Sequence, residues 1–179
     1  MLSRSRFGAF GAAIVAVLFT TAARAHATLE GEEAPINSTY KAVIRVGHGC
    51  EGLPTLKLRV RIPEGVVAVK PMPKPGWTLE TVKASYGQSY DYFGTPVTEG
   101  VREIVWTGKL LDEHYDEFVF RARLTDRLPV GEMLYFPTVQ ECEGGKAERW
   151  IEIPAVGKSA DDYEYPAPGL KLLPAGDRH

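Results

Sequence analysis

Apolar and polar residues alternate strictly between Thr55 and Ile62, with leucine, valine or isoleucine at the even positions and lysine or arginine at 57, 59 and 61. A repeat of two residues is the pattern of a β-strand that packs one face and exposes the other. Similar runs predict six further strands, at Tyr40–Val46, Thr78–Ala84, Arg102–Thr107, Glu117–Leu124, Met133–Val139 and Ala147–Ile153.

Short sequences typical of turns separate these runs. They contain proline or glycine, as in Pro63-Glu64-Gly65, Pro75-Gly76, Glu99-Gly100, Pro129-Val130-Gly131 and Gly144-Gly145. No stretch longer than a turn or two has helical periodicity. We therefore expect an all-β, immunoglobulin-like β-sandwich of about seven to eight strands, with a closed β-barrel as the alternative. The eighth strand is an edge strand at Leu170–Leu173, in the extended segment that follows Pro154.

The first 25 residues have the composition of a signal peptide. Two arginines precede an almost wholly apolar run from Phe7 to Phe19, and Ala23-Arg24-Ala25 has the small-x-small pattern of a cleavage site. A run of about 13 residues is too short to cross a bilayer as a helix, which takes about 20. We expect cleavage after Ala25 and a periplasmic or secreted protein, with one domain over residues 26–173 and a disordered tail at 174–179.

Removal of this segment makes the chain more acidic. The full sequence has 21 basic and 23 acidic residues; residues 1–25 hold three arginines and no acid, so 18 against 23 remain, a net charge of −5. Nucleic acid is not an expected partner, because phosphate binding draws on clustered positive charge, whereas a cation suits this balance. No later segment reaches membrane-spanning length, so no membrane span is expected in the mature protein.

Cys50 and Cys142 are the only cysteines. In an exported protein two cysteines most simply pair, and a bridge that encloses roughly 90 residues stabilises the fold by on the order of 4 kcal/mol. It would hold His48 and Glu51 near the segment around Gln140. A thiolate metal site is the alternative, although the spacing lacks the C-x-x-C pattern typical of such sites.

His26 becomes the first residue of the chain when the signal peptide is cut after Ala25. Its free α-amino nitrogen and its imidazole Nδ1 can then bind one metal ion together. Nitrogen donors of this kind suit Cu(II), whereas Cu(I) prefers sulfur, and only Met72 and Met133 remain after cleavage. The sequence therefore predicts a Cu(II) site at the mature N-terminus, against the alternative of a frayed terminal residue.

Further candidate ligands surround the predicted disulfide. His48 lies between two glycines beside Cys50, where it is either a ligand or an ordinary turn residue. Glu51, Glu141 and Glu143 are candidates for an oxygen ligand or for a hydrogen bond to an imidazole, and acidic loop residues are otherwise solvated. Trp150 follows the Cys142 loop and is a candidate wall of the site, with core packing as the alternative.

Six segments of the chain together resemble the YcnI-like exported copper-binding proteins. They are His26-Ala27-Thr28-Leu29-Glu30, Glu33-Ala34-Pro35, Arg59-Val60-Arg61-Ile62-Pro63-Glu64-Gly65-Val66, Lys74-Pro75-Gly76-Trp77, Tyr135-Phe136-Pro137-Thr138-Val139-Gln140 and Pro166-Ala167-Pro168. The resemblance implies a β-sandwich that binds Cu(II) through a single-histidine brace, aided by a carboxylate and a tryptophan. His26 matches the brace and Trp150 the tryptophan. At the position of the carboxylate this chain departs from the pattern, which leaves His48 or a displaced Glu51 as the ligand.

The resemblance further implies a role in copper trafficking, storage or tolerance, with a periplasmic copper chaperone or acceptor protein as the partner. We expect no enzymatic activity. Two other classes of function stay open at this point. His26 with His48 resembles the copper site of polysaccharide monooxygenases, although no flat aromatic platform for a substrate is evident. A metal-free immunoglobulin-like binding module is the other alternative.

Overall fold

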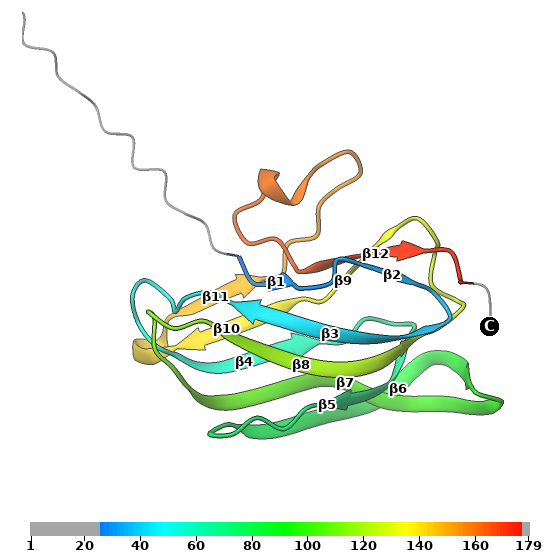
Figure 1. The fold of residues 1–179 in the computed structure, drawn as a ribbon, viewed down its shortest axis with the longest axis horizontal. Coiled ribbons are helices and arrows are strands. Elements are labelled where there is room, and N and C mark those ends of the chain that lie inside the picture. The colour runs from blue at the N-terminus through cyan, green and yellow to red at the C-terminus, as the bar shows by residue number, and fades with distance from the viewer. Residues whose placement is uncertain (1–25, 177–179) are drawn as a thin grey trace, which may run out of the picture.

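The computed structural model describes residues 26–176 and has two large β-sheets packed face to face (Figure 1). The predicted signal peptide and the last three residues of the predicted tail lie outside the described residues. An immunoglobulin-like β-sandwich is therefore confirmed. The described residues include no helix long and apolar enough to cross a membrane.

The first sheet has four strands in the order β1-β3-β8-β5. They are β1 (Thr28–Leu29), β3 (Ser38–Val46), β8 (Asp116–Leu124) and β5 (Val66–Pro71). β3 and β8 are antiparallel and pair along their whole length. The short strand β1 continues this sheet beyond β3 through the pairs Thr28↔Arg45 and Leu29↔Ile44, which fixes the start of the described chain at the sheet edge.

The second sheet has five strands in the order β11-β10-β4-β7-β6. They are β11 (Ala147–Trp150), β10 (Thr138–Cys142), β4 (Thr55–Arg61), β7 (Thr95–Leu110) and β6 (Thr78–Tyr92). A smaller sheet has the order β2-β12-β9, with β2 (Glu33–Pro35), β12 (Gly169–Leu173) and β9 (Met133–Tyr135). The strand expected at Leu170–Leu173 is thus present, but it lies between two neighbours and not at an edge.

Aromatic and branched side chains from both large sheets fill the space between them. Trp106 is fully buried, and its ring meets Phe118 edge to face at 5.5 Å between centroids. Trp77 contacts Phe118 at 4.9 Å, also edge to face. Contacts of this geometry add to the free energy gained by burying the rings themselves. Two of the three tryptophans therefore serve the core.

The sequence prediction missed three strands, β5, β1 and β2, and took two strands for one. β5 did not show in the alternation, because Val66, Val67 and Val69 are all buried and Ala68 interrupts the pairing at φ 51°. β1 and β2 are too short to show a repeat. The run Met133–Val139 forms two strands, β9 and β10, which belong to different sheets.

The predicted turn at Glu99-Gly100 is wrong. Both residues lie inside β7, and the hairpin turns instead at Phe93-Gly94, where φ is 51° and 84°. Gly100 is required by close packing, because a Cβ atom there would lie 1.8 Å from the Tyr86 hydroxyl oxygen. Glycine in a strand marks a close approach of another group as often as a turn.

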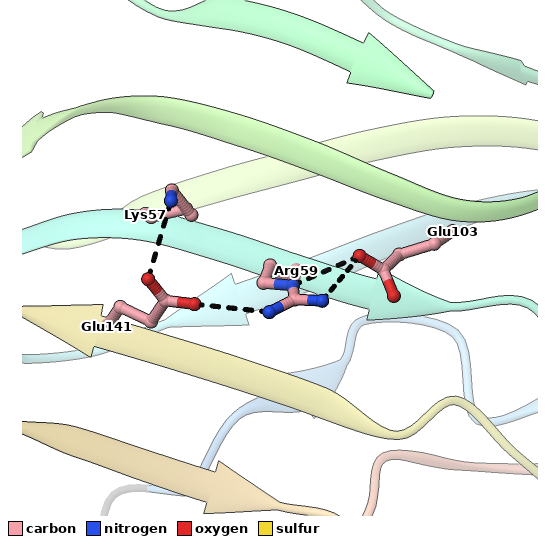
Figure 2. A network of polar contacts seen from close by, with 4 residues as sticks. All are labelled: Lys57, Arg59, Glu103 and Glu141. Carbon is pink, nitrogen blue, oxygen red and sulfur yellow. Dashed lines mark hydrogen bonds and ion pairs between the residues drawn. The ribbon is translucent and has the colours of Figure 1, made fainter. Parts of the chain in front are cut away.

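The outer face of the five-stranded sheet carries a network of charged side chains (Figure 2). Arg59 donates to Glu103 at 2.9 and 3.0 Å and to Glu141 at 3.4 Å, and Lys57 pairs with Glu141 at 3.5 Å. Ion pairs this exposed contribute little stability. They do fix the direction of Glu141, which points away from the interior of the sandwich.

Cys50 and Cys142 form the predicted disulfide, with 5.9 Å between their Cα atoms and a sequence separation of 92. The bond joins the loop after β3 to the end of β10. It holds in place two chain segments whose side chains take part in the site described below.

Replacement of both cysteines, Cys50→Ala with Cys142→Ala, should lower the free energy of unfolding by about 4 kcal/mol, because the unfolded chain regains the freedom of a long loop. Urea denaturation followed by circular dichroism measures this. Wild-type protein unfolded in the presence of a reductant is the control and should show a similar loss. A change below about 1 kcal/mol would contradict the stabilising role of the bond.

Candidate metal centre

His26 is the first residue of the described chain and directly precedes β1. Its ring lies against Trp150, with 5.4 Å between the ring centroids and 57° between their planes. The pairing of β1 with β3 carries the histidine to this position. The predicted mature terminus is therefore seated against the protein and not frayed.

Trp150 ends β11 and is 4% exposed. Besides His26 it contacts Tyr165, at 5.2 Å between ring centroids, and its indole Nε1 donates to Gln140 Oε1 at 3.4 Å. The third tryptophan thus lies at the His26 end of the sandwich, where the sequence had placed it as a candidate wall.

The Gln140 side chain connects Trp150 on β11 with the loop that carries His48. It is 2% exposed, and its Nε2 donates to the His48 carbonyl at 2.6 Å and to Thr55 Oγ1 at 2.7 Å. Its Oε1 accepts from Trp150. A buried amide with all of these bonds made holds its neighbours in one arrangement. The loop of His48 is therefore tied to the wall of the His26 site.

The His48 loop makes a tight turn between β3 and β4. Cys50 and Leu53 exchange two backbone hydrogen bonds of 3.0 Å, and Gly49 N donates to Asp112 Oδ1 at 2.9 Å. A Cβ atom on Gly49 would lie 1.8 Å from the Leu53 carbonyl oxygen, so this position requires glycine. The His48 imidazole is half-buried, and its Nδ1 contacts the Gly49 carbonyl.

The acidic residues predicted from their nearness to the cysteines point elsewhere. Glu51 is exposed and pairs with Lys146 at 2.8 Å. Glu143 lies 3.8 Å from Lys109, and Glu141 belongs to the outer-face network. A ligand role for Glu51 would require its pair with Lys146 to open, and it stays a prediction.

Glu148 is the acidic residue that the sequence interpretation missed. It lies two positions before Trp150 in β11, and therefore on the same face of the strand, directly opposite Gln140 in the register. Burial raises its pKa above the ordinary value of 4.5, nearby Glu51 and Asp112 act in the same direction, and His48 opposes them. Glu148 and Trp150 are two residues apart in the alternating run 147–153. The inward direction of Trp150 could therefore have indicated that Glu148 also points inward.

A few buried polar atoms have no hydrogen-bond partner. In residues 26–176, three buried side-chain nitrogen or oxygen atoms have no hydrogen-bond partner: His26 Nε2, Glu148 Oε2 and Arg45 Nε. Of these atoms, Arg45 Nε has a charged neighbour, Glu117 Oε1, at 3.9 Å. Buried polar atoms in folded proteins are nearly always paired, so an exception calls for an explanation such as a bound ion. His26 Nε2 belongs to the ring that lies against Trp150, and Glu148 lies on β11 within the electrostatic influence of His48, Glu51 and Asp112.

A pocket of about 340 Å³ adjoins His26 on its open side. It lies between β1, β9 and the loop after β11, which rises in orange beside the start of β1 (Figure 1). The base of this loop is closed by hydrogen bonds from Glu152 N to Tyr165 O at 3.0 Å and from Ala167 N to Glu152 O at 2.8 Å. His26 is therefore walled by Trp150 and also accessible from the pocket.

No three histidine, cysteine, aspartate or glutamate side chains in residues 26–176 converge closely enough to hold a metal ion by themselves. A histidine brace does not need such a cluster, because one of its donors is the main-chain nitrogen that cleavage frees. The imidazole of His26, seated against Trp150 and open to the pocket, fits a metal held by a brace and one further ligand.

The family comparison agrees with this description of the chain. Residues 26–172 match the family described as a domain of unknown function, DUF1775. The chain belongs to the DUF1775 family. YcnI-like proteins, to which the sequence shows a resemblance, are members of the same family. A comparison with curated protein sequences finds no match for this DUF1775 protein.

Among solved structures, this DUF1775 chain is similar to one from Nocardia farcinica, described as an uncharacterized protein that reveals an immunoglobulin-like fold. The TM-score is 0.59 at 24% sequence identity, and the match covers 83% of this chain and 98% of the other. A likeness at this level of identity supports the fold and nothing about the chemistry of the site.

Glu148→Gln should make this DUF1775 protein more stable above the ordinary carboxyl pKa, when a chelator is present. A raised pKa means that the folded state binds the proton more tightly than the unfolded state, so the free energy of unfolding falls as pH rises from 4.5 through the raised value. The variant has no such charge and should lose less stability over this interval. Urea denaturation between pH 4 and pH 8 measures the difference, and parallel pH profiles for the two proteins would contradict it.

Proposed function

We propose that the protein beginning at His26 binds one Cu(II) ion through its α-amino nitrogen and the Nδ1 atom of His26. It acts outside the cytoplasm in copper trafficking, storage or tolerance. The observation that carries this proposal is the seating of the His26 ring against Trp150 at the end of β11, beside an open pocket. A terminal histidine without a role would have no reason to be held in this way.

The donor chemistry supports copper among the divalent metals. An amine and an imidazole are nitrogen donors, and Cu(II) stands highest in the affinity order for such sites. Both cysteines are consumed by the disulfide, so no thiolate is left to favour Zn²⁺ or Cu(I). Family membership is compatible with this function.

Binding and transfer suit this site better than catalysis. The wall of the site is a buried tryptophan, and the open side is a pocket of modest size that gives a partner access to His26. We propose that a periplasmic copper chaperone or acceptor exchanges copper there. His48 stays a candidate for an additional ligand.

Protein that begins at His26 should bind Cu(II) in a 1:1 ratio, and the same protein with one added N-terminal methionine should bind it at least about a hundredfold more weakly. Loss of a supporting residue alone costs roughly 10–100-fold in metal affinity, so loss of a chelating donor should cost no less. Calorimetric titration against a competing chelator measures both. Equal affinity of the two proteins would favour the metal-free binding module.

Cu(II) bound beside Trp150 should quench its fluorescence, because a paramagnetic ion quenches a nearby indole. Trp150→Phe retains a ring for His26 and leaves only the core residues Trp77 and Trp106 to emit. We expect stoichiometric Cu(II) to quench a large fraction of the wild-type emission and little of the emission of this variant. Equal fractional quenching in the two proteins would place the ion away from His26.

A further inference from the structure

We propose that the outer face of the four-stranded sheet docks on a membrane surface that carries anionic phospholipids, with Phe93 at the tip of the β6–β7 hairpin as an apolar anchor. This face is separate from the copper centre, and the inference does not rest on the proposed function. Two observations support it: basic side chains that gather without acidic partners, and an exposed aromatic ring held beside them.

Basic side chains from three neighbouring strands lie side by side on this face. In the register, Arg121 of β8 is directly opposite Lys41 of β3 on one side and Lys70 of β5 on the other. Residues directly opposite each other share a face of the sheet, and these three side chains are exposed. Arg123 lies two residues further along β8 and therefore on the same face. The sheet thus presents four positive charges together.

No acidic side chain compensates these four charges. In residues 26–176 none of the four forms an ion pair, whereas Arg45, at the other end of β3, pairs with both Glu30 and Glu117. Like charges directly opposite one another destabilise a sheet. The arrangement also runs against the composition, since the predicted mature chain has 18 basic and 23 acidic residues. An anionic partner would supply the missing charge.

Phe93 holds an aromatic ring in solvent at the tip of the hairpin. Its side chain is 71% exposed, and Phe93 and Gly94 both have positive φ, at 51° and 84°. A two-residue turn of this kind favours Asn-Gly, and a bulky residue with positive φ is an outlier. The Arg123 guanidinium lies over the ring, 4.9 Å from its centroid, so the ring adjoins the basic face. Such an outlier indicates a role for the ring outside the fold.

A second exposed apolar side chain belongs to the same face. Met72 is 54% exposed and lies two residues after Lys70, and its backbone N donates to Val119 O at 2.8 Å, which continues β5 along β8. Apolar side chains that enter the headgroup layer, together with lysine and arginine that attract anionic headgroups, are the elements of interfacial membrane binding. The composition of this face therefore favours a lipid surface over a purely polar partner.

The shape of the face favours an extended anionic surface over a small anion. The hollow beside Tyr92, Arg121 and Arg123 has a volume of only about 10 Å³, room for about one water molecule. A larger hollow of about 500 Å³ beside Phe93 includes the Asp91 carboxylate, which would repel a small anion and accepts from Gly94 N at 3.0 Å. The hairpin tip lies at the end of the sandwich away from the loop between β3 and β4 (Figure 1).

The test uses protein that begins at His26, with a chelator present so that copper plays no part. Co-sedimentation is measured with vesicles of phosphatidylglycerol and phosphatidylcholine in equal amounts, and with vesicles of phosphatidylcholine alone. We expect binding to the anionic vesicles at low ionic strength, no binding to the neutral ones, and release at about 1 M salt, where charges are screened within about 3 Å.

Two double variants separate the basic face from the net charge. Each basic side chain near an anionic surface strengthens binding about fivefold, so Lys41→Gln with Arg121→Gln should weaken it about thirtyfold. Arg61→Gln with Arg149→Gln removes the same charge from exposed positions on the outer face of the five-stranded sheet, and binding should stay within about threefold of wild type. The first variant relieves repulsion, so its melting temperature should be no lower than that of the wild type.

Variants of Phe93 test the anchor. Phe93→Asn introduces the residue that this turn favours, so the melting temperature should not fall, yet vesicle binding should weaken at least about fivefold. Phe93→Trp places a fluorescent ring at the tip, and its emission should shift to shorter wavelength when anionic vesicles are added, because the indole leaves water.

Three results would overturn the inference. The first is wild-type protein that does not bind the anionic vesicles. The second is an equal loss of binding in the two double variants, which would show that only net charge matters. The third is binding to heparin as tight as binding to vesicles, with no emission shift in Phe93→Trp on vesicles, which would assign the face to a soluble polyanion. None of these results bears on copper binding at His26.

Discussion

The hydrogen bonds of the buried Gln140 side chain hold the candidate centre together. Its amide accepts from the Trp150 indole and donates to the His48 carbonyl and to Thr55 Oγ1, so it joins the edge strand β11, the loop after β3 and the strand β4. The Cys50–Cys142 disulfide adds a covalent bond between the loop after β3 and the end of β10. This arrangement, together with the pairing of β11 on β10 and the contact with Tyr165, holds Trp150 in place, and the seat for His26 depends on Trp150.

Near these bonded side chains lie buried polar atoms that have no hydrogen-bond partner. His26 Nε2 and Glu148 Oε2 are buried without partners, whereas Gln140 and Thr55 nearby are fully bonded. A protein selected for stability alone would pair or replace such groups. Such atoms are compatible with the proposed metal site, which would use groups that the packing leaves unpaired.

Much of the fold could be predicted from the alternation of side chains, because most strands pack one face on the core and expose the other. β5 could not, since Val66, Val67 and Val69 are all buried, and neither could β1, which is only two residues long. The predicted turn at Gly100 failed because glycine there makes room for Tyr86. Local sequence does not distinguish a glycine that bends the chain from one that admits a distant side chain.

The site was predictable in part for a similar reason. His26, Trp150 and the cysteine pair follow from cleavage, resemblance and composition, and the structure brings the first two together. The acidic candidates were chosen by nearness in sequence to the cysteines, but the sheet register directs Glu141 outward and Glu148 inward. Which carboxylate points inward depends on strand pairing, and a single sequence does not specify that.

A crystal structure of copper-loaded protein that begins at His26 tests the central claim most directly. The account predicts one copper ion, bonded to the α-amino nitrogen and to Nδ1 of His26, with Trp150 still against the imidazole ring. Copper bound elsewhere on the surface, or a His26 that lies free of Trp150 without copper, would contradict it.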